Sequence, residues 1–232
     1  MNQIQCLLDR ESAARRLAQR LHRLKGSHPL ILAVPRGAAP MGKILAEELE
    51  GDLDMVLVRK LGAPGEPELA IGAVDESGEI VLHADASSMG IDAPYVEEEA
   101  RRQLDVIRRR RVLYTPDRGP LDAEGRTVVL VDDGVATGAT LVSALRTVRR
   151  QRPAELIVAA GVISTSALAR LRRLADEVVC LLSTDEFFSV SQFFVDFRQV
   201  NDDEVVAILR EHERSRVGPA AAAGVAKGGR ES

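Results

Sequence analysis

Two adjacent aspartates at the end of an apolar run are the residues of this sequence best suited to chemistry. Residues 127–131 (TVVLV) predict a buried strand, and Asp132 and Asp133 follow at its carboxyl end. Carboxylates accept hydrogen bonds and attract hydrated cations, so their natural partners are sugar hydroxyls or a metal with its water shell. A helix cap beside a magnesium-binding carboxylate is the plainer alternative.

The loop after the aspartates has the composition of a phosphate-binding turn. It leads into a predicted helix at 139–150. The amino end of a helix carries unpaired N–H donors and about +0.5 elementary charge, which suits a phosphate dianion. The donors would come from Thr137, Gly138, Ala139 and Thr140. Phosphate donors beside hydroxyl acceptors predict a site for a ribose 5-phosphate.

Short apolar runs alternate with helical patterns along most of the chain. Strands are predicted at 30–34, 54–59, 127–131, 156–162 and 178–182, with a hairpin at 69–82 around the turn DESG. Helices are predicted from Asp9 or Ser12 to about 24, and at 41–49, 95–112, 139–150, 164–174 and 201–213. Apolar strands separated by helices favour a doubly wound α/β fold, a mostly parallel sheet with helices on both faces. Ligands of such sheets bind beyond the carboxyl ends of the strands.

The composition is that of a soluble globular protein. Of the 232 residues 45% are hydrophobic and 28% charged, and 31 Lys and Arg against 35 Asp and Glu give a formal net charge of −4. This balance argues against nucleic acid or a membrane surface as a partner. Cys6 and Cys180 lack zinc-ligand spacing, the first residues are too charged for a signal peptide, and no apolar run approaches ~20 residues. We therefore expect a cytoplasmic protein with one domain at 1–217 and a disordered Ala/Gly-rich tail at 218–232.

Four segments resemble a known family. VVLVDDGVATGAT (128–140) resembles the signature of type I phosphoribosyltransferases, which bind 5-phosphoribosyl-1-pyrophosphate. AVPRGAAPMG (33–42), VRKLGAPGEPELAIGAV (58–74) and DEVVCLLSTDEFFSVSQFFVDF (176–197) are similar to a little-characterised family of phosphoribosyltransferase-domain proteins. The resemblance spans residues 9–213 and implies a small C-terminal hood at about 183–200.

Within this resemblance the aspartates and the loop after them bind the ribose 5-phosphate. Asp132 and Asp133 would hold the ribose hydroxyls, and Ala136 to Thr140 the 5-phosphate. The family holds Mg²⁺ chiefly through substrate oxygens and water, with Asp132 or Asp133 as the candidate protein ligand. Two positions depart from the family. Gly134 stands where an aliphatic residue is usual, and Ala136 stands where hypoxanthine–guanine salvage enzymes place an aspartate, so that enzyme class is a poor match.

The resemblance assigns the pyrophosphate of the donor to a second loop. This loop comprises Pro35, Arg36, Gly37, Ala38 and Ala39. Gly37 would allow close approach of the backbone, and family members often hold a non-proline cis peptide here. Ala38 and Ala39 stand where relatives often have two glycines.

Basic residues follow the second predicted strand. Arg59 and Lys60 are similar to the basic pair that reaches pyrophosphate in the family, and Arg36 would add a charged fork. Without the resemblance, each is explained equally well as a basic residue at the surface. We expect the catalytic residues to be Asp132, Asp133, Arg36 and Lys60.

The implied reaction transfers the ribose 5-phosphate group to a nitrogen of a nucleobase-like acceptor and releases pyrophosphate, as in nucleotide salvage. Its transition state would be oxocarbenium-like, and catalysis would come from positioning and from stabilising the leaving group. A regulator that binds the donor without turnover needs the same residues and is the alternative, and a phosphatase on the same fold is a third reading. A homodimer is the default expectation for a soluble oligomer.

Two further clusters have unusual composition. The run 97–111 (EEEARRQLDVIRRRR) predicts a solvated helix whose glutamates pair with Arg101 and Arg102, in preference to an RNA-binding face. Its arginines at 108–111 cannot all face one partner, because a helix spreads them around its axis, and some of them would close over the site. All five phenylalanines lie in 187–197, and we expect most to pack together and one or two to face the base.

Overall fold

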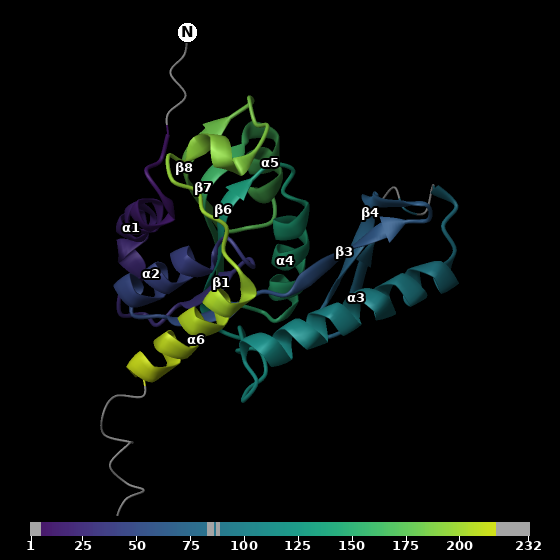
Figure 1. Ribbon diagram of the computed structural model, residues 1–232, viewed down its shortest axis with the longest axis horizontal. Coiled ribbons are helices and arrows are strands. Elements are labelled where there is room, and N and C mark those ends of the chain that lie inside the picture. Colours follow the sequence, from purple (N-terminus) through teal and green to yellow (C-terminus); the bar gives the residue numbers. More distant parts are fainter. Residues whose placement is uncertain (1–5, 83–85, 87–88, 217–232) are drawn as a thin grey trace, which may run out of the picture.

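A five-stranded sheet forms the centre of the molecule (Figure 1). The computed structural model describes residues 6–82, 86 and 89–216, so the tail predicted at 218–232 lies outside the described residues. The strands are β1 (Leu30–Ala33), β2 (Asp52–Met55), β6 (Thr127–Val135), β7 (Glu155–Ser164) and β8 (Glu177–Thr184). They pair in the order β2-β1-β6-β7-β8, and every pairing is parallel.

Helices cover both faces of this sheet, which confirms the doubly wound α/β fold. They are α1 (Arg10–Arg20), α2 (Ala39–Leu49), α4 (Ala139–Arg150), α5 (Thr165–Leu171) and α6 (Asp202–Arg216). Successive side chains of a strand point to opposite faces. Ile31 and Ala33 therefore pack in the core under α1 and α2, while Leu30 and Leu32 pack under α4 and α5. Helix α6 lies outside α2 in the first of these layers (Figure 1).

The caps of two helices agree with the predicted starts. Asp9 Oδ1 accepts a hydrogen bond from the Ser12 amide at 2.7 Å, and the Asp9 amide donates to Ser12 Oγ at 3.2 Å. Asn201 and Glu204 form the predicted capping box of α6, with both bonds at 2.9 Å. Helix α1 ends before the predicted residue 24, and a 3-10 turn, η1 (His22–Leu24), follows it.

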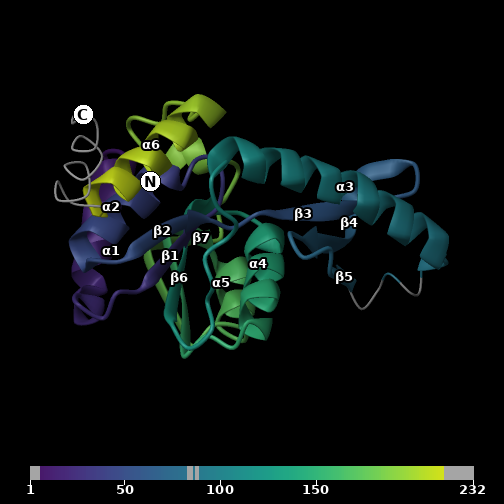
Figure 2. The ribbon, with the colours of Figure 1, turned by 90° about the horizontal axis from the view of Figure 1, so that it is seen from below.

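A separate arm projects from the carboxyl edge of the sheet (Figures 1 and 2). It comprises the antiparallel strands β3 (Val58–Ala63), β4 (Glu66–Asp75) and β5 (Ile80–Leu82), and the long helix α3 (Ala93–Tyr114). Strands β4 and β5 confirm the predicted hairpin. Along α3, Arg101 pairs with Glu98 at 2.6 Å and Arg102 with Glu99 at 2.8 Å, so the predicted pairing of these charges is confirmed.

The prediction of one strand at 54–59 is wrong. Strand β2 ends at Met55, paired with Ala33, the last residue of β1. Beyond Ala33 the chain turns at Pro35 into α2, so β2 has no neighbour to pair with and leaves the sheet. Arg59 and Lys60 consequently lie on β3 of the arm, not in a loop after a strand of the central sheet.

Strand β6 is longer than predicted. It includes Asp132, Asp133 and Gly134, because β7 continues beside it and pairs Gly134 with Val162. The expectation that Gly134 belongs to a loop is therefore wrong. A Cβ added to Gly134 would lie 2.4 Å from Val190 Cγ1, so only glycine fits under the 3-10 turn η3 (Val190–Phe193).

The segment predicted as a hood, residues 183–200, packs over the carboxyl ends of β6 and β7. Phe193 and Phe194 are buried in the core, and the rings of Phe187 and Phe193 lie 5.0 Å apart between centroids. These contacts agree with the expectation that most of the phenylalanines pack together. Phe188 is 90% exposed and is available to a ligand or partner. That a ring faces a base stays a prediction.

The buried His212 on α6 makes the stability of the fold depend on pH. Both ring nitrogens lack a hydrogen-bond partner among the described residues, and burial together with the charge of Arg216 lowers the pKa of the imidazole below 6.5. The folded state therefore keeps the ring neutral where the unfolded chain already binds a proton. Stability is lost as the pH falls below about 6.5, because the unfolded state takes up more protons.

We expect His212→Leu to lose less stability than the wild-type chain between pH 7.5 and 5.5. The substitution removes the titrating group and two unpartnered nitrogens, so the variant should also be about 1 kcal/mol more stable at pH 7.5. Urea unfolding at a series of pH values measures both effects. Parallel pH profiles for the two proteins would contradict the prediction.

Candidate functional site

The predicted pyrophosphate loop follows β1 and turns directly into α2. Its Pro35–Arg36 peptide bond is cis, as the resemblance implied. Gly37 lies against the aspartate pair, and a Cβ added to it would come within 2.2 Å of Asp133 Oδ2. Glycine is thus required for the loop to approach β6. Ala38 and Ala39 are buried in the core below the loop, where their methyl groups pack.

A buried ion pair joins Asp133 to the first helix. The Nε of Arg10 donates to Asp133 Oδ2 at 2.9 Å, and Nη2 lies 2.8 Å from the same oxygen. Arg10 Nη1 donates to the carbonyl oxygen of Arg198 at 2.6 Å, and the guanidinium lies 3.8 Å from the centre of the Phe197 ring. The two charged side chains are 10% and 11% exposed. Arg10 thus connects α1, β6 and the hood segment at one point.

Asp132 has a different environment from its neighbour. Its Oδ1 accepts a hydrogen bond from the Asp133 amide at 2.9 Å, and it forms no ion pair within the described part of the chain. Burial and the charge of Asp133 raise the pKa of the Asp132 carboxyl well above its usual value. A carboxyl group without a basic partner is suited to hydroxyl donors or to a hydrated cation.

The predicted phosphate loop presents open amide groups. Gly138 has a φ of +75°, which favours glycine, and α4 begins at the next residue without a side-chain cap. Ala136 and Thr137 are exposed. Ser164 Oγ donates to the Ala136 carbonyl oxygen at 2.5 Å, and this bond ties the loop to the start of α5. The Ala139 amide donates to Thr137 Oγ1 over a long 3.4 Å, and the rest of the helix start leaves N–H donors for an anion.

A cavity of about 300 Å³ lies between the pyrophosphate loop, the start of α4 and the arm. It brings together five of the predicted residues, namely Pro35, Arg59, Lys60, Ala139 and Thr140. The rest of its lining consists of Val34, Val56, Val58, Ala70, Gly72, Arg110 and Ser143. Among the described residues the lining includes basic side chains and hydroxyls but no acidic side chain, so the cavity is suited to an anion.

The other predicted residues lie outside this cavity. They are Arg36, Gly37, Ala38, Asp132, Asp133, Ala136, Thr137 and Gly138. Arg36 is exposed, and its Nη1 lies 3.4 Å from Asp202 Oδ2 at the start of α6. The Tyr114 hydroxyl donates to Asp202 Oδ1 at 2.5 Å, and burial together with this carboxylate raises the pKa of Tyr114. Helices α3 and α6 thus orient Arg36 through Asp202.

Sequence reasoning missed Arg10, Tyr114 and Asp202 and singled out Arg110 only as part of a run. Arg10 directly follows a helix cap, where an arginine is ordinarily a solvated residue, so no local signal points to its buried partner. Tyr114 was one of only two tyrosines in the chain, and that rarity was the one available hint.

Two other kinds of site are absent from the described residues. No group of three or more His, Cys, Asp or Glu side chains is placed to share a metal ion there. No described helix has both the length and the apolar character needed to cross a bilayer.

The fold and the site define the architecture of a type I phosphoribosyltransferase. Residues 2–198 match the family model described as "Phosphoribosyl transferase domain", and the chain belongs to this family. Two Mycobacterium tuberculosis proteins, from strains CDC 1551 and H37Rv, are 40% identical over 207 residues, and both are named "Putative phosphoribosyl transferase". These 207 residues are 89% of this chain and 47% of each relative, so the chain spans about half of their length.

Two further proteins are similar. A ribose-phosphate pyrophosphokinase of Methanopyrus kandleri is 33% identical over 148 residues, which cover 64% of this chain and 43% of that protein. The crystal structure of TT1426 from Thermus thermophilus has a TM-score of 0.80 and 45% identity, and the match covers 89% of this chain and 98% of that chain. Its fold therefore agrees with the one described above.

We expect Arg10→Met to destabilise the protein by about 3–5 kcal/mol, because it leaves Asp133 buried and charged without a partner. The double variant with Asp133→Asn should recover part of this loss. Urea unfolding of the two single variants and the double variant measures the coupling. Arg16→Met is the matched control, because Arg16 is exposed on the same helix and its loss should stay within about 0.5 kcal/mol. An Arg10→Met variant as stable as this control would contradict the prediction.

Proposed function

We propose that this protein is a Mg²⁺-dependent phosphoribosyltransferase. It transfers the ribose 5-phosphate group of phosphoribosyl pyrophosphate to a nitrogen of a nucleobase-like acceptor and releases pyrophosphate. One observation carries the proposal: the aspartates of β6, the uncapped start of α4 and the basic cavity lie along one edge of the sheet. They offer phosphate donors, hydroxyl acceptors and cations, which are complementary to the 5-phosphate, the ribose hydroxyls and the pyrophosphate of the donor molecule.

The ribose 5-phosphate end of the donor binds at β6 and α4. Thr137 and the amides of 138–140 hold the 5-phosphate at the helix terminus. Asp132 accepts hydrogen bonds from the ribose hydroxyls, while Asp133 is held in place by Arg10, which uses only its Oδ2. This anchoring holds the carboxylates at a fixed position relative to the phosphate loop. It therefore reduces the conformational entropy that these side chains lose when the donor binds.

The pyrophosphate end binds between the loop of Arg36 and the arm. Departure of this group from the anomeric carbon leaves an oxocarbenium-like sugar, and negative charge accumulates on the leaving oxygen. Arg36, Arg59 and Lys60 stabilise that charge by electrostatic attraction, which is strongest where water is scarce. The reaction therefore places its cations on one side of the ribose and its carboxylates on the other.

The residues present fit Mg²⁺ as a partly hydrated ion. Asp132 has no basic partner within the described part of the chain and would supply one oxygen ligand, with the remaining ligands coming from phosphates and water. When bound, the ion neutralises part of the charge of the departing pyrophosphate.

A regulator that binds the donor without turnover is the second candidate. It is favoured by the lining of the cavity, in which no described residue is an Asp, Glu or His that could take a proton from an acceptor nitrogen. Nucleotide salvage, a cytoplasmic location and a homodimer stay predictions, as does the division into a domain at 1–217 with a hood at 183–200.

Release of pyrophosphate from the donor distinguishes these functions. With Mg²⁺ and a panel of nucleobases, a transferase releases pyrophosphate only when its acceptor is present. A regulator shows thermal stabilisation by the donor but no release, and a phosphatase hydrolyses the donor without any acceptor. Either of the last two results would refute the proposed transfer.

We expect Thr137→Ala to weaken donor binding about tenfold, because it removes a hydroxyl that bonds a charged phosphate. Asp132→Asn should weaken binding by a similar factor, with the melting temperature of the free protein retained. Calorimetric titration measures both affinities. Thr147→Ala on α4, the helix that follows the loop, is the control, since Thr147 lies away from the helix start. Unchanged affinity in both site variants would count against this assignment.

A further inference from the structure

Arg110 of α3 lines the basic cavity and has no partner among the described residues. It shares the lining with Thr140, Arg59 and Lys60. Its side chain is half-buried, and it makes no hydrogen bond or ion pair with any described residue. A half-buried guanidinium without a counter-ion has lost part of its hydration, and no ion pair or hydrogen bond offsets that loss.

The charge of Arg110 also acts on Arg59. Arg59 donates from Nε to Gln103 Oε1 at 2.9 Å, a neutral partner. Burial, and then the charge of Arg110, lower the pKa of Arg59. Two guanidinium groups therefore face one small cavity and repel each other. Such repulsion costs stability in the free protein and is relieved when an anion binds between the groups.

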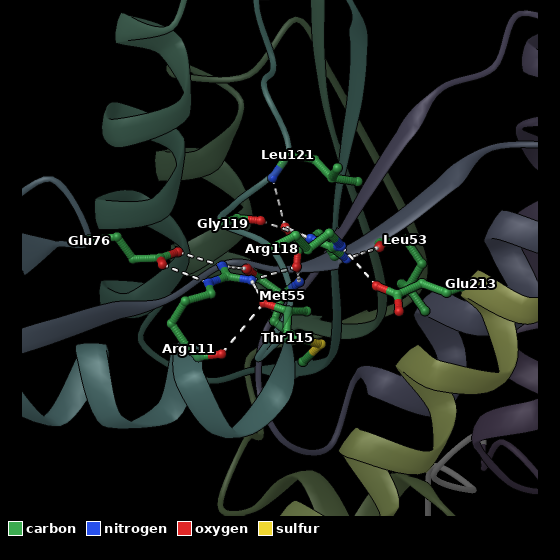
Figure 3. A network of polar contacts seen from close by, with 10 residues as sticks. Leu53, Met55, Glu76, Arg111, Thr115, Arg118, Gly119, Leu121 and Glu213 are labelled. Carbon is green, nitrogen blue, oxygen red and sulfur yellow. Dashed lines mark hydrogen bonds and ion pairs between the residues drawn. The ribbon is translucent and has the colours of Figure 1, made fainter.

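The neighbouring Arg111 explains why Arg110 takes this direction. Arg111 Nη1 binds Asp54 at 2.7 Å and its Nη2 binds Glu76 at 2.5 Å, while Nη2 also donates to the Met55 carbonyl oxygen (Figure 3). Asp54 is fully buried, so this contact anchors α3 against β2. Arg118 secures the same carboxylate at 3.1 Å and also pairs with Glu213 on α6 (Figure 3).

This anchoring fixes the rotation of α3 about its axis. Successive residues of a helix point about 100° apart. With Arg111 held by Asp54 and Glu76, Arg110 is directed to the cavity, and Arg108 and Arg109 are left exposed. The contacts of Arg111 shown in Figure 3 thus set the position of Arg110, which makes none of these contacts itself.

The opposite wall of the cavity supplies neutral donors. Ala139 and Thr140 lie at the start of α4, and Ser143 lies one turn further along. The proposed function assigns this helix start to the 5-phosphate of the donor. The guanidinium side of the cavity is therefore left for a second anionic group, and the pyrophosphate of the donor is the group that the guanidinium planes of Arg59 and Arg110 fit.

We propose that Arg110 is a pyrophosphate-binding residue that acts with Arg59 as a pair of guanidinium groups. Together they hold the leaving group of the donor and the pyrophosphate product, and they connect the arm to the central domain through the bound anion. This inference rests on the proposed function for the role of pyrophosphate in the reaction. The binding of inorganic pyrophosphate tests it separately.

The test compares Arg110→Gln with Arg109→Gln and the wild-type chain. Arg109 is exposed on the same helix, and its Nε donates to the Asp105 carbonyl oxygen. Calorimetric titration with inorganic pyrophosphate, with and without Mg²⁺, should show at least a tenfold loss of affinity for Arg110→Gln and none for Arg109→Gln. Arg110→Lys should recover part of the affinity, because the charge remains but the planar fork is lost.

A second measurement separates binding from folding. Without ligand, Arg110→Gln should melt at the same temperature as the wild type or higher, because the repulsion of Arg59 is gone. With pyrophosphate, the rise in melting temperature seen for the wild type should largely disappear. A structural role for Arg110 predicts the reverse, a lower melting temperature of the free variant with an undiminished response to pyrophosphate.

The outcomes distinguish this inference from the proposed function. Wild-type affinity for pyrophosphate in Arg110→Gln overturns the inference, even if acceptor-dependent transfer is found. A wild-type chain that binds no pyrophosphate under either condition overturns it as well. Pyrophosphate binding that depends on Arg110, in a protein without acceptor-dependent transfer, supports the inference and refutes the transferase.

Discussion

The contact between Arg10 and Asp133 is the constraint on which the arrangement of the site depends. A carboxylate that is nearly buried at the end of a central strand is costly unless a cation accompanies it, and the cation comes from the first turn of α1. The same guanidinium holds the Arg198 carbonyl oxygen and stacks on Phe197, so the hood segment is fixed by the same group. Gly37 completes the contact, because any side chain there would displace Asp133.

This contact divides the charges of the site into two groups. Asp133 is neutralised within the protein, whereas Arg59 and Arg110 line a cavity that no described acidic side chain lines. In the free protein, the charges of Arg59 and Arg110 are therefore available to an anion, whereas the Asp133 carboxylate already has a basic partner. A ligand with anionic groups at both ends and hydroxyls between them is complementary to this division, because its hydroxyls can lie at the aspartates while its anionic groups lie at the helix start and at the basic cavity.

Features set by neighbouring residues could be predicted from the sequence, and features set by distant ones could not. The capping box of Asn201 and Glu204 and the apolar run of β6 are local, and both were found. The end of β2 depends on where β1 stops, and the length of β6 depends on β7, so both boundaries were misplaced. The aspartate pair and the phosphate loop were predicted as a unit because they are consecutive. The partner of Asp133 was missed because it lies on another helix.

The four arginines at 108–111 show why a run of like residues needs a structure before it can be given a function. One helix axis distributes them to different surroundings: Arg111 is buried against two carboxylates, Arg110 faces the cavity, and the other two are exposed. The two inward arginines differ in burial and in the presence of a counter-ion among the described residues. Arg111 has one and holds the arm in place, whereas Arg110 has none there and gains one from a ligand. Removing a paired buried charge destabilises a fold, whereas removing an unpaired one does not. Arg111 therefore contributes to the stability of the fold, and the adjacent Arg110 contributes to ligand binding.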